Sequence, residues 1–161
     1  SNENFSAFLN ILKSTEQNTK LALSLSDPGV VDTFKDRFKE VFKVRKADYL
    51  FCNKDEATSL VGNNFVKDLS NIAVNFVVTN GAESSFVVEN GSYAEIKAKK
   101  VKAIDSNGAG DMFAGAALNK IIEEESFLDA CKFGNYASSK IVQEKSPRLS
   151  VDQYKKLKAD Y

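Results

Sequence analysis

The stretch Asp105-Ser106-Asn107-Gly108-Ala109-Gly110-Asp111 joins a turn of small residues to a carboxylate at the predicted start of a helix. Residues 101–104 lead into it as a short strand or extended segment, and the small and apolar residues 112–118 continue it as a buried helix. Gly108 and Gly110 allow neighbouring backbone N–H groups to point into one concavity, where the helix N-terminus adds a partial positive charge. The stretch therefore predicts an anion-binding site.

Asp111 lies beside this predicted anion site, where its own negative charge would repel an anion. A carboxylate is useful there if it takes a proton from an attacking hydroxyl, so Asp111 is a candidate general base. The alternative is purely structural, because an Asp at the start of a helix can accept hydrogen bonds from unpaired N–H groups. Short glycine motifs also arise by chance. The turn alone therefore leaves both interpretations open.

The composition excludes several classes of function. Of the 161 residues, 43% are hydrophobic and 27% are charged, as expected for one soluble globular domain with a core. The 22 basic and 22 acidic residues cancel, so no net charge favours nucleic acid or an anionic membrane as a partner. No apolar run approaches the roughly 20 residues of a membrane span and no signal peptide opens the chain, which predicts a cytoplasmic location.

The chain contains no histidine, which excludes Ser-His-Asp triads and zinc sites with histidine ligands. A general base must then be a carboxylate, Lys, Tyr or Cys. Cys52 and Cys131 are surrounded by apolar residues and are expected to be buried free thiols. The charged runs 123–125 and 155–158 are interpreted as solvated helix surface.

The order of the predicted elements indicates an α/β fold, because strands alternate with amphipathic helices. The apolar run 73–79 is typical of a parallel strand covered on both faces, and Asn90-Gly91 predicts an antiparallel hairpin. We expect one domain over 1–161 with three layers, a mostly parallel central sheet flanked by helices, and this hairpin. The expected strands are 21–25, 48–52, 73–79, 85–89 and 92–96. The expected helices lie around 5–12, from Pro28 to before Asp48, from residue 53 or 54, and over 64–70, 109–123, 126–145 and 150–160, with Asp27, Ser126 and Ser150 as N-caps.

Residues 105–118 resemble the C-terminal signature of the PfkB-type, ribokinase-like carbohydrate and nucleoside kinases, which reads Asp-Thr-x-Gly-Ala-Gly-Asp followed by small residues. Ser106 stands where Thr is commoner, and it keeps the hydroxyl. Asn53-x-x-Glu56 resembles the Asn-x-x-Glu motif of the family, and Thr79-x-Gly81 resembles its nucleotide-side turn. The order and spacing of these motifs extend the resemblance over residues 20–149.

The resemblance implies that the γ-phosphoryl group of ATP is transferred to an alcohol of a small sugar or nucleoside, with Asp111 as the base. Gly108, Ala109 and Gly110 would form the anion hole. Since ligands of open α/β sheets bind beyond the carboxyl ends of the strands, the motifs are expected to meet in one cleft. The nucleotide would be bound by Thr79, Gly81 and Asn135.

The resemblance also implies metal ions. Asn53 and Glu56 would hold Mg²⁺ through water, although the same pair fits a helix N-cap with a capping-box Glu. Asp105 and Asn107 match positions beside which many relatives hold a monovalent cation such as K⁺. Lys145-Ser146 departs there from the usual Gly-Ala, and Asp105 also fits a simple turn former.

Members of the family usually run to about twice this length and hold the sugar mainly through an N-terminal part with a β-sheet lid. No motif of that part is visible here, so we expect the C-terminal, ATP-side half of a longer kinase, with little activity alone. Ser1-Asn2 is interpreted as the remnant of a tag, and dimerisation through the lid is left open. Asn107 before Gly108 favours a nucleoside or furanose sugar. The alternative is a non-catalytic nucleotide-binding or interaction module, whereas a dinucleotide-binding oxidoreductase lacks its Gly-x-Gly-x-x-Gly.

Overall fold

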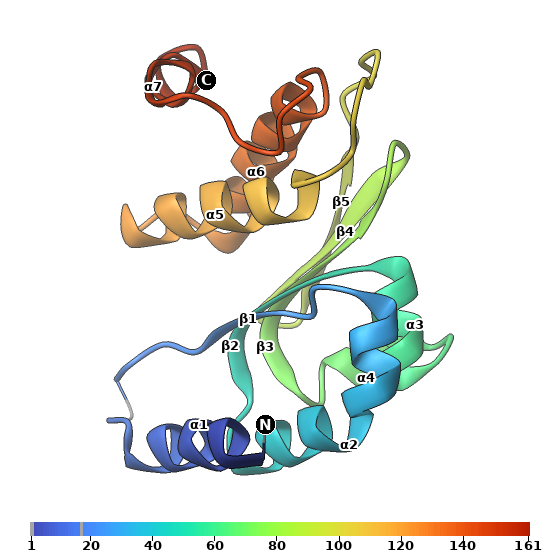
Figure 1. Cartoon of the computed structure of the whole chain (residues 1–161), viewed down its shortest axis with the longest axis vertical. Coiled ribbons are helices and arrows are strands. Elements are labelled where there is room, and N and C mark those ends of the chain that lie inside the picture. The colour runs from blue at the N-terminus through green and yellow to red at the C-terminus, as the bar shows by residue number, and fades with distance from the viewer. Residues whose placement is uncertain (1, 17) are drawn as a thin grey trace. The chain divides into compact units, whose positions relative to one another are not determined.

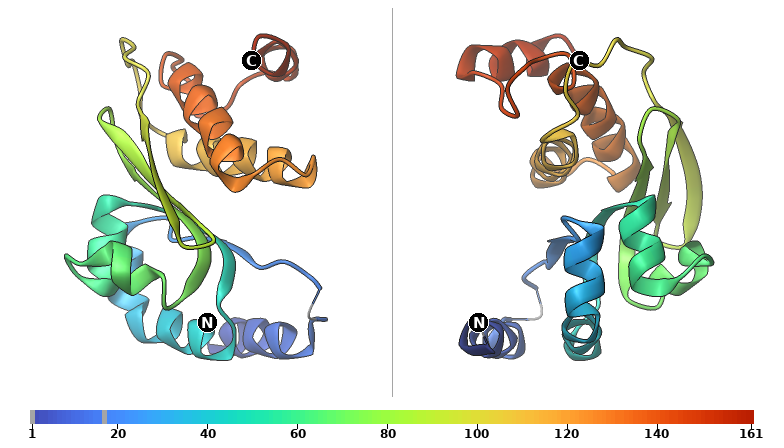
Figure 2. Two further views of the ribbon diagram at one scale, coloured as in Figure 1. Left: turned by 180° about the vertical axis from the view of Figure 1, so that it is seen from behind. Right: turned by 45° about the vertical axis from the view of Figure 1, so that its right-hand side comes forward.

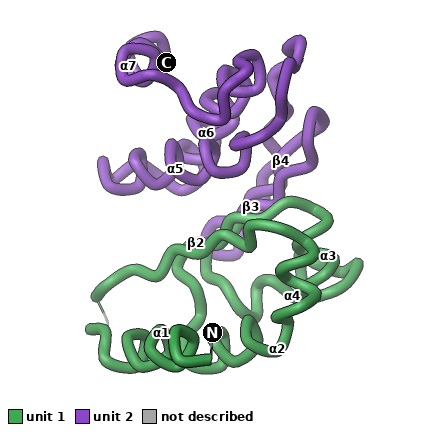
Figure 3. The backbone as a smooth tube through the Cα atoms, in the orientation of Figure 1, with its two compact units in different colours: residues 1–76 green, residues 77–161 purple. Residues whose placement is uncertain are grey.

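The computed structural model describes residues 2–16 and 18–161 and contains a five-stranded sheet in the order β1-β2-β3-β4-β5 (Figure 1). β1 pairs with β2 in parallel and β4 pairs with β5 antiparallel, so the sheet is mixed and the predicted α/β fold is confirmed. The chain divides into two compact units, Ser1–Phe76 and Val77–Tyr161 (Figure 3). Within the described residues, no helix combines the length and the apolar character that a membrane crossing requires.

The first unit alternates helices and strands around a core that includes the fully buried Leu25, Leu50 and Phe76. Its second helix begins as the sequence predicts, because the Asp27 carboxylate accepts hydrogen bonds from two N–H groups of the first turn and Pro28 is the first helical residue. The elements are α1 (Asn2–Ser14), β1 (Ala22–Ser24), α2 (Pro28–Val44), β2 (Ala47–Asn53), α3 (Lys54–Val61), α4 (Phe65–Leu69) and the start of β3 (Ala73–Asn80).

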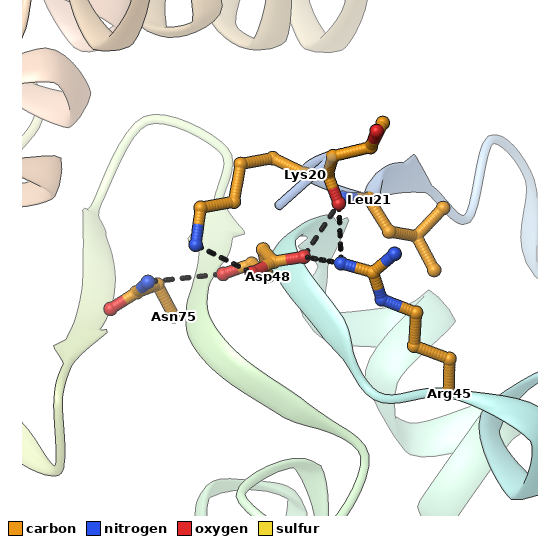
Figure 4. Close-up of polar contacts among 6 residues, drawn as sticks. Lys20, Leu21, Arg45, Asp48 and Asn75 are labelled. Carbon is orange, nitrogen blue, oxygen red and sulfur yellow. Dashed lines mark hydrogen bonds and ion pairs between the residues drawn. The ribbon is translucent and has the colours of Figure 1, made fainter. Parts of the chain in front are cut away.

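Asp48 in β2 forms hydrogen bonds with the residues just before β1 and with a residue of β3 (Figure 4). One carboxylate oxygen accepts from the Leu21 N–H and from Arg45, both at 2.9 Å, and the other accepts from Lys20 Nζ at 3.2 Å. The backbone oxygen of Asp48 accepts from Asn75 Nδ2 at 3.0 Å. Burial alone would raise the pKa of Asp48, but the hydrogen bond from Leu21 and the two cations outweigh it and hold the pKa below its ordinary value.

We expect Asp48→Asn to destabilise the first unit by about 1–2 kcal/mol at pH 7, because hydrogen bonds to a charged group are stronger than those to a neutral amide. Folding lowers the pKa of Asp48, so its contribution is complete above the ordinary carboxyl pKa of about 3.9 and is lost as the pH falls through the lowered value. Urea denaturation at pH 7 and pH 3 measures this, and the difference between the two proteins should shrink at pH 3. Asp36→Asn, which removes an exposed carboxylate, is the matched control. A difference that does not change with pH would contradict the role of the charge.

The second unit contains the hairpin and three helices. Asn90 and Gly91 adopt the left-handed backbone conformation, with φ of 48° and 81°, that a tight hairpin turn requires, so the predicted hairpin is confirmed. Ser126 and Ser150 cap the last two helices, also as predicted. The remaining elements are β4 (Ser84–Glu89), β5 (Ser92–Lys97), α5 (Ala109–Ile122), α6 (Phe127–Ile141) and α7 (Val151–Ala159).

α5 and α6 pack closely against each other (Figure 2). A Cβ on Gly134 of α6 would lie 2.8 Å from the carbonyl oxygen of Phe113 in α5, so only glycine permits this approach. The carboxylate of Glu89, at the end of β4, accepts from the Phe127 N–H at 2.6 Å and so joins the strand to the start of α6. α7 closes the core with Leu157, which belongs to a buried cluster that also contains Met112, Phe133, Ala137, Ile141 and Leu149.

One predicted boundary is wrong. The helix expected over 126–145 ends at Ile141, because the Val142 carbonyl accepts hydrogen bonds from the Ile104 and Asp105 N–H groups and the chain then turns toward Pro147. Of the two alternatives predicted for residues 101–104, a strand of the sheet is not formed, and the same two bonds hold the end of this segment. Both outcomes depend on a contact between segments that are distant in the sequence.

Candidate active site

The turn before α5 is built by Asp105 and Gly108. The Asp105 carboxylate accepts from the Asn107 N–H at 2.9 Å, which closes the turn on itself and confirms the turn-forming role of Asp105. Gly108 then adopts φ +77°, the left-handed region that favours glycine, and becomes the N-cap of α5. Because Gly108 carries no side chain, no side-chain oxygen covers the start of this helix.

The first turn of α5 therefore offers open hydrogen-bond donors. The Ala109 N–H donates to Ser106 O at 3.2 Å, and the Met112 N–H begins the helical ladder on Gly108 O at 2.9 Å. Within the described part of the chain, the N–H groups of Gly110 and Asp111 have no hydrogen-bond partner. These two N–H groups, on the positive end of the helix dipole, are the donors best placed to receive an anion.

Asp111 is exposed in the first turn of α5, and no described residue hydrogen-bonds to its carboxylate. The structural alternative, in which Asp111 caps the helix, does not hold because Gly108 is the N-cap and no side chain accepts from the first turn. Asp111 lines a cavity of about 580 Å³ within the second unit. An unpaired carboxylate beside open N–H donors and a cavity can accept a proton from a bound hydroxyl.

Asn53 and Glu56 form a complete capping box at the start of α3 in the first unit. The Glu56 carboxylate accepts from the Asn53 N–H at 3.0 Å and from its Nδ2 at 2.7 Å, and Asn53 Oδ1 accepts from the Glu56 N–H at 2.8 Å. Burial raises the pKa of Glu56, the Asn53 hydrogen bond opposes this, and the nearby Asp27 and Asp55 carboxylates raise it further.

The capping box limits what this pair can do for a metal ion. The described residues contain no cluster of three or more acidic or cysteine side chains suited to a metal, so a purely protein-made site does not fit. Each oxygen of the Glu56 carboxylate accepts one hydrogen bond and keeps a free lone pair. The pair therefore fits a water-mediated role toward Mg²⁺, which usually retains several waters.

The predicted nucleotide residues lie in the second unit. Thr79 is half-buried near the end of β3, and the exposed Gly81 follows with φ +55°, so the expected turn after the strand is present. Asn135 Nδ2 donates to Lys97 O at 3.1 Å, which joins α6 to the end of β5. Asn135 thus has a structural role, and its side-chain oxygen remains available as an acceptor.

The structure brings some predicted residues together and separates others by unit. One continuous turn contains Asp105, Asn107, Gly108 and the start of α5. The chain just after α6 also contacts this turn, because the Val142 carbonyl accepts a hydrogen bond from the Asp105 N–H. The side chains of Asn53 and Glu56 belong to the first unit, so one common cleft remains a prediction. Arg148 and Lys155, which were not predicted as site residues from the sequence, line the same cavity as Asp111. Their only signal was positive charge near the end of the chain.

Residues 6–153 match the family model of the pfkB family carbohydrate kinases. The chain belongs to this family. It is 32% identical over 145 residues to adenosine kinase 2 of Arabidopsis thaliana, an alignment that covers 78% of this chain and 41% of that protein. It is also 37% identical over 75 residues to the ribokinase of Haemophilus influenzae, covering 47% of this chain and 24% of the relative.

Solved structures confirm the fold. The adenosine kinase of Sinorhizobium meliloti superposes with a TM-score of 0.86 at 22% identity, over 99% of this chain and 50% of that protein. A probable sugar kinase from Rhizobium etli gives 0.86 at 23% identity, over 96% of this chain and 48% of that protein. This pfkB chain therefore spans half or less of the length of these relatives.

Proposed function

We propose that this pfkB chain is the ATP-side part of a phosphotransferase that moves the γ-phosphoryl group of ATP to an alcohol of a sugar or nucleoside. The observation that carries the proposal is the pairing of an unpartnered Asp111 carboxylate with the open N–H groups of Gly110 and Asp111. Phosphoryl transfer requires both parts, because the attacking hydroxyl must lose a proton while negative charge develops on the transferred group. The family membership supports the same reaction.

Each group has a separate task in this mechanism. The Asp111 carboxylate accepts the proton of the acceptor hydroxyl as its oxygen attacks the γ-phosphorus, and ADP leaves with the electrons of the broken P–O bond. The two open N–H groups and the α5 dipole stabilise the charge on the phosphoryl oxygens. Glu56 and Asn53 would hold Mg²⁺ through water, and the chemistry supplied there would be neutralisation of phosphate charge. Thr79, Gly81 and Asn135 contact the nucleotide.

The acceptor is a nucleoside or a furanose sugar. Two adenosine kinases of Arabidopsis thaliana align over 145 residues of this chain at 32% and 30% identity, and ribokinases align over shorter segments. Asn107 before Gly108 favours the same acceptors. We further propose that the enzyme acts in the cytoplasm, that the turn at Asp105 and Asn107 holds K⁺, and that the part outside this chain forms the lid and the dimer contact.

ADP release from Mg-ATP by the complete product of the gene tests the proposal, with adenosine, ribose and fructose as acceptors. Turnover that depends on one acceptor would support the kinase and identify its substrate class. If ATP still binds but no acceptor causes ADP release, the second candidate is favoured, which is a non-catalytic nucleotide-binding module. The open N–H groups of α5 support that candidate as well, since they serve binding without chemistry.

We expect the 161-residue chain alone to release ADP no faster with acceptor than without it, and to bind Mg-ATP only weakly. The reason is that it spans about two fifths to half of the length of its relatives and shows no sugar-binding motif. A coupled ADP assay with adenosine and ribose measures the rate, and calorimetry measures nucleotide binding. Acceptor-dependent ADP release that Asp111→Asn abolishes would show that the chain suffices for catalysis.

A further inference from the structure

The cavity that Asp111 lines also contains residues that have no role in the proposed mechanism. α5 contributes Asp111, Gly115 and Asn119, which lie four residues apart and therefore on one face of the helix. α7 and the segment before it also supply lining residues, among them Arg148 and Lys155. The volume of about 580 Å³ lies within the range of small-molecule sites.

The position of α7 is fixed by contacts that do not involve the side chains of Arg148 and Lys155. Leu157 is buried in the helical core of the second unit. Lys158 pairs with Glu123 at the end of α5, and Tyr161 packs edge-on against Phe133 with ring centroids 4.8 Å apart. Gln153 Nε2 donates to Glu144 at 3.0 Å. α7 is therefore held by contacts within the protein itself.

The cations of the cavity are not neutralised by the protein. Among residues 2–16 and 18–161, neither Arg148 nor Lys155 has a hydrogen-bonding or ion-pair partner for its side chain, whereas Lys158 has Glu123. Asp111 is the acidic residue that lines the cavity, so two unpaired cations and one paired cation face one carboxylate. An organic anion would complete this charge distribution, because charged groups in a recess are stabilised by an opposite charge.

The lining of the cavity combines apolar and polar side chains. Met112, Ala116 and Phe133 are apolar, and Asn119 and Tyr154 add hydrogen-bonding groups. A bare inorganic anion would leave this apolar surface without a partner. A ligand with an organic body and an anionic end fits both parts of the cavity.

We propose that the cavity between α5 and α7 binds a small organic phosphate through Arg148 and Lys155, a proposal that rests on the phosphotransferase function. Asp111 lines the same cavity and is the proposed base, so the phosphoryl group bound there takes part in the transfer. It belongs either to the nucleotide or to the phosphorylated acceptor. Arg148 and Lys155 are then binding residues that a signature ending at Leu118 does not contain.

The chain offers a matched pair of lysines for the test. Lys155 lines the cavity, whereas its neighbour Lys156 on the same exposed helix does not. Lys155→Gln and Lys156→Gln therefore remove the same charge from the same helix on two different faces. Arg148→Gln and Lys145→Gln form a second pair in the segment between α6 and α7. Because all four side chains are exposed, the variants are expected to fold.

Calorimetric titrations of the complete gene product with ADP and with ribose 5-phosphate distinguish the two sources of the phosphate. We expect Arg148→Gln and Lys155→Gln each to raise the Kd of one of the two ligands about tenfold, as loss of a charge-assisted contact would. Lys145→Gln and Lys156→Gln should stay within about twofold of the unchanged protein, as surface substitutions do. Amide NMR shifts at Gly115 and Asn119 should follow the same titration and place the ligand in the cavity.

Three results would overturn the proposal. They are equal effects of the cavity and control variants, no effect of any variant, and absence of binding by both phosphates. If binding depends on Arg148 and Lys155 but Asp111→Asn leaves turnover of the complete gene product unchanged, the phosphotransferase function fails and the phosphate site stands. If turnover depends on Asp111 while binding is insensitive to Arg148 and Lys155, the proposed phosphate site is contradicted and the phosphotransferase function is not.

Discussion

Asp111→Asn is expected to lower the rate of acceptor-dependent ADP release by about 10²–10⁴-fold, the usual contribution of a general base. This corresponds to a barrier higher by about 3–5 kcal/mol. The substitution keeps the size of the side chain and removes its ability to accept a proton at neutral pH. Because Asp111 is exposed and has no described hydrogen-bond partner, the free energy of unfolding should change by less than about 0.5 kcal/mol.

Nucleotide binding separates this role from a structural one. Removal of a negative charge beside the open N–H groups should leave the affinity for Mg-ATP unchanged or raise it, since a carboxylate repels phosphate. The rate is measured at saturating acceptor with the complete gene product, and the Kd by calorimetry. Asp32→Asn in α2, an exposed carboxylate without a described partner, is the control. A rate within about tenfold of the unchanged protein would remove Asp111 from the mechanism.

Features that depend on neighbouring residues could be predicted from the sequence. The Asp27 cap of α2, the Asn90-Gly91 turn and the capping box of Asn53 and Glu56 each join residues no more than three positions apart. Their geometry is set by local hydrogen bonds and backbone preferences, so residue type is sufficient. The same holds for Gly108, because the small-residue turn and the following helix lie in one continuous stretch.

Features that join distant segments could not be predicted. The Asp48 carboxylate binds the Leu21 N–H across 27 residues, and Glu89 binds the start of α6 across 38. The charged residues of the runs 123–125 and 155–158 are exposed, as predicted, whereas Leu157 is buried. Lys158 nevertheless pairs with Glu123, and Lys155 lines the cavity. Periodicity identifies the exposed face of a helix, but it does not say which other helix that face meets.

Gly108→Ala is expected to destabilise the second unit by about 2–5 kcal/mol. The left-handed conformation at φ +77° costs a residue with a Cβ about 1–2 kcal/mol. The new Cβ would also lie 2.6 Å from the Pro147 backbone oxygen, and overpacking of this kind costs about 1–3 kcal/mol. For a chain of this size the melting temperature should fall by about 5–15 °C, measured by circular dichroism.

Gly110→Ala, two residues further along, separates the effect on the fold from the effect on the site. No atom lies within 4 Å of a Cβ added at Gly110, and its backbone is helical, so the variant should be as stable as the unchanged protein or slightly more stable. The same Cβ would enter the open space beside the two free N–H groups, so binding of Mg-ATP should weaken. Stable protein with weakened binding would show that the empty space at Gly110 serves a ligand. Unchanged binding would mean that the anion sits elsewhere, even if Gly108→Ala unfolds the unit.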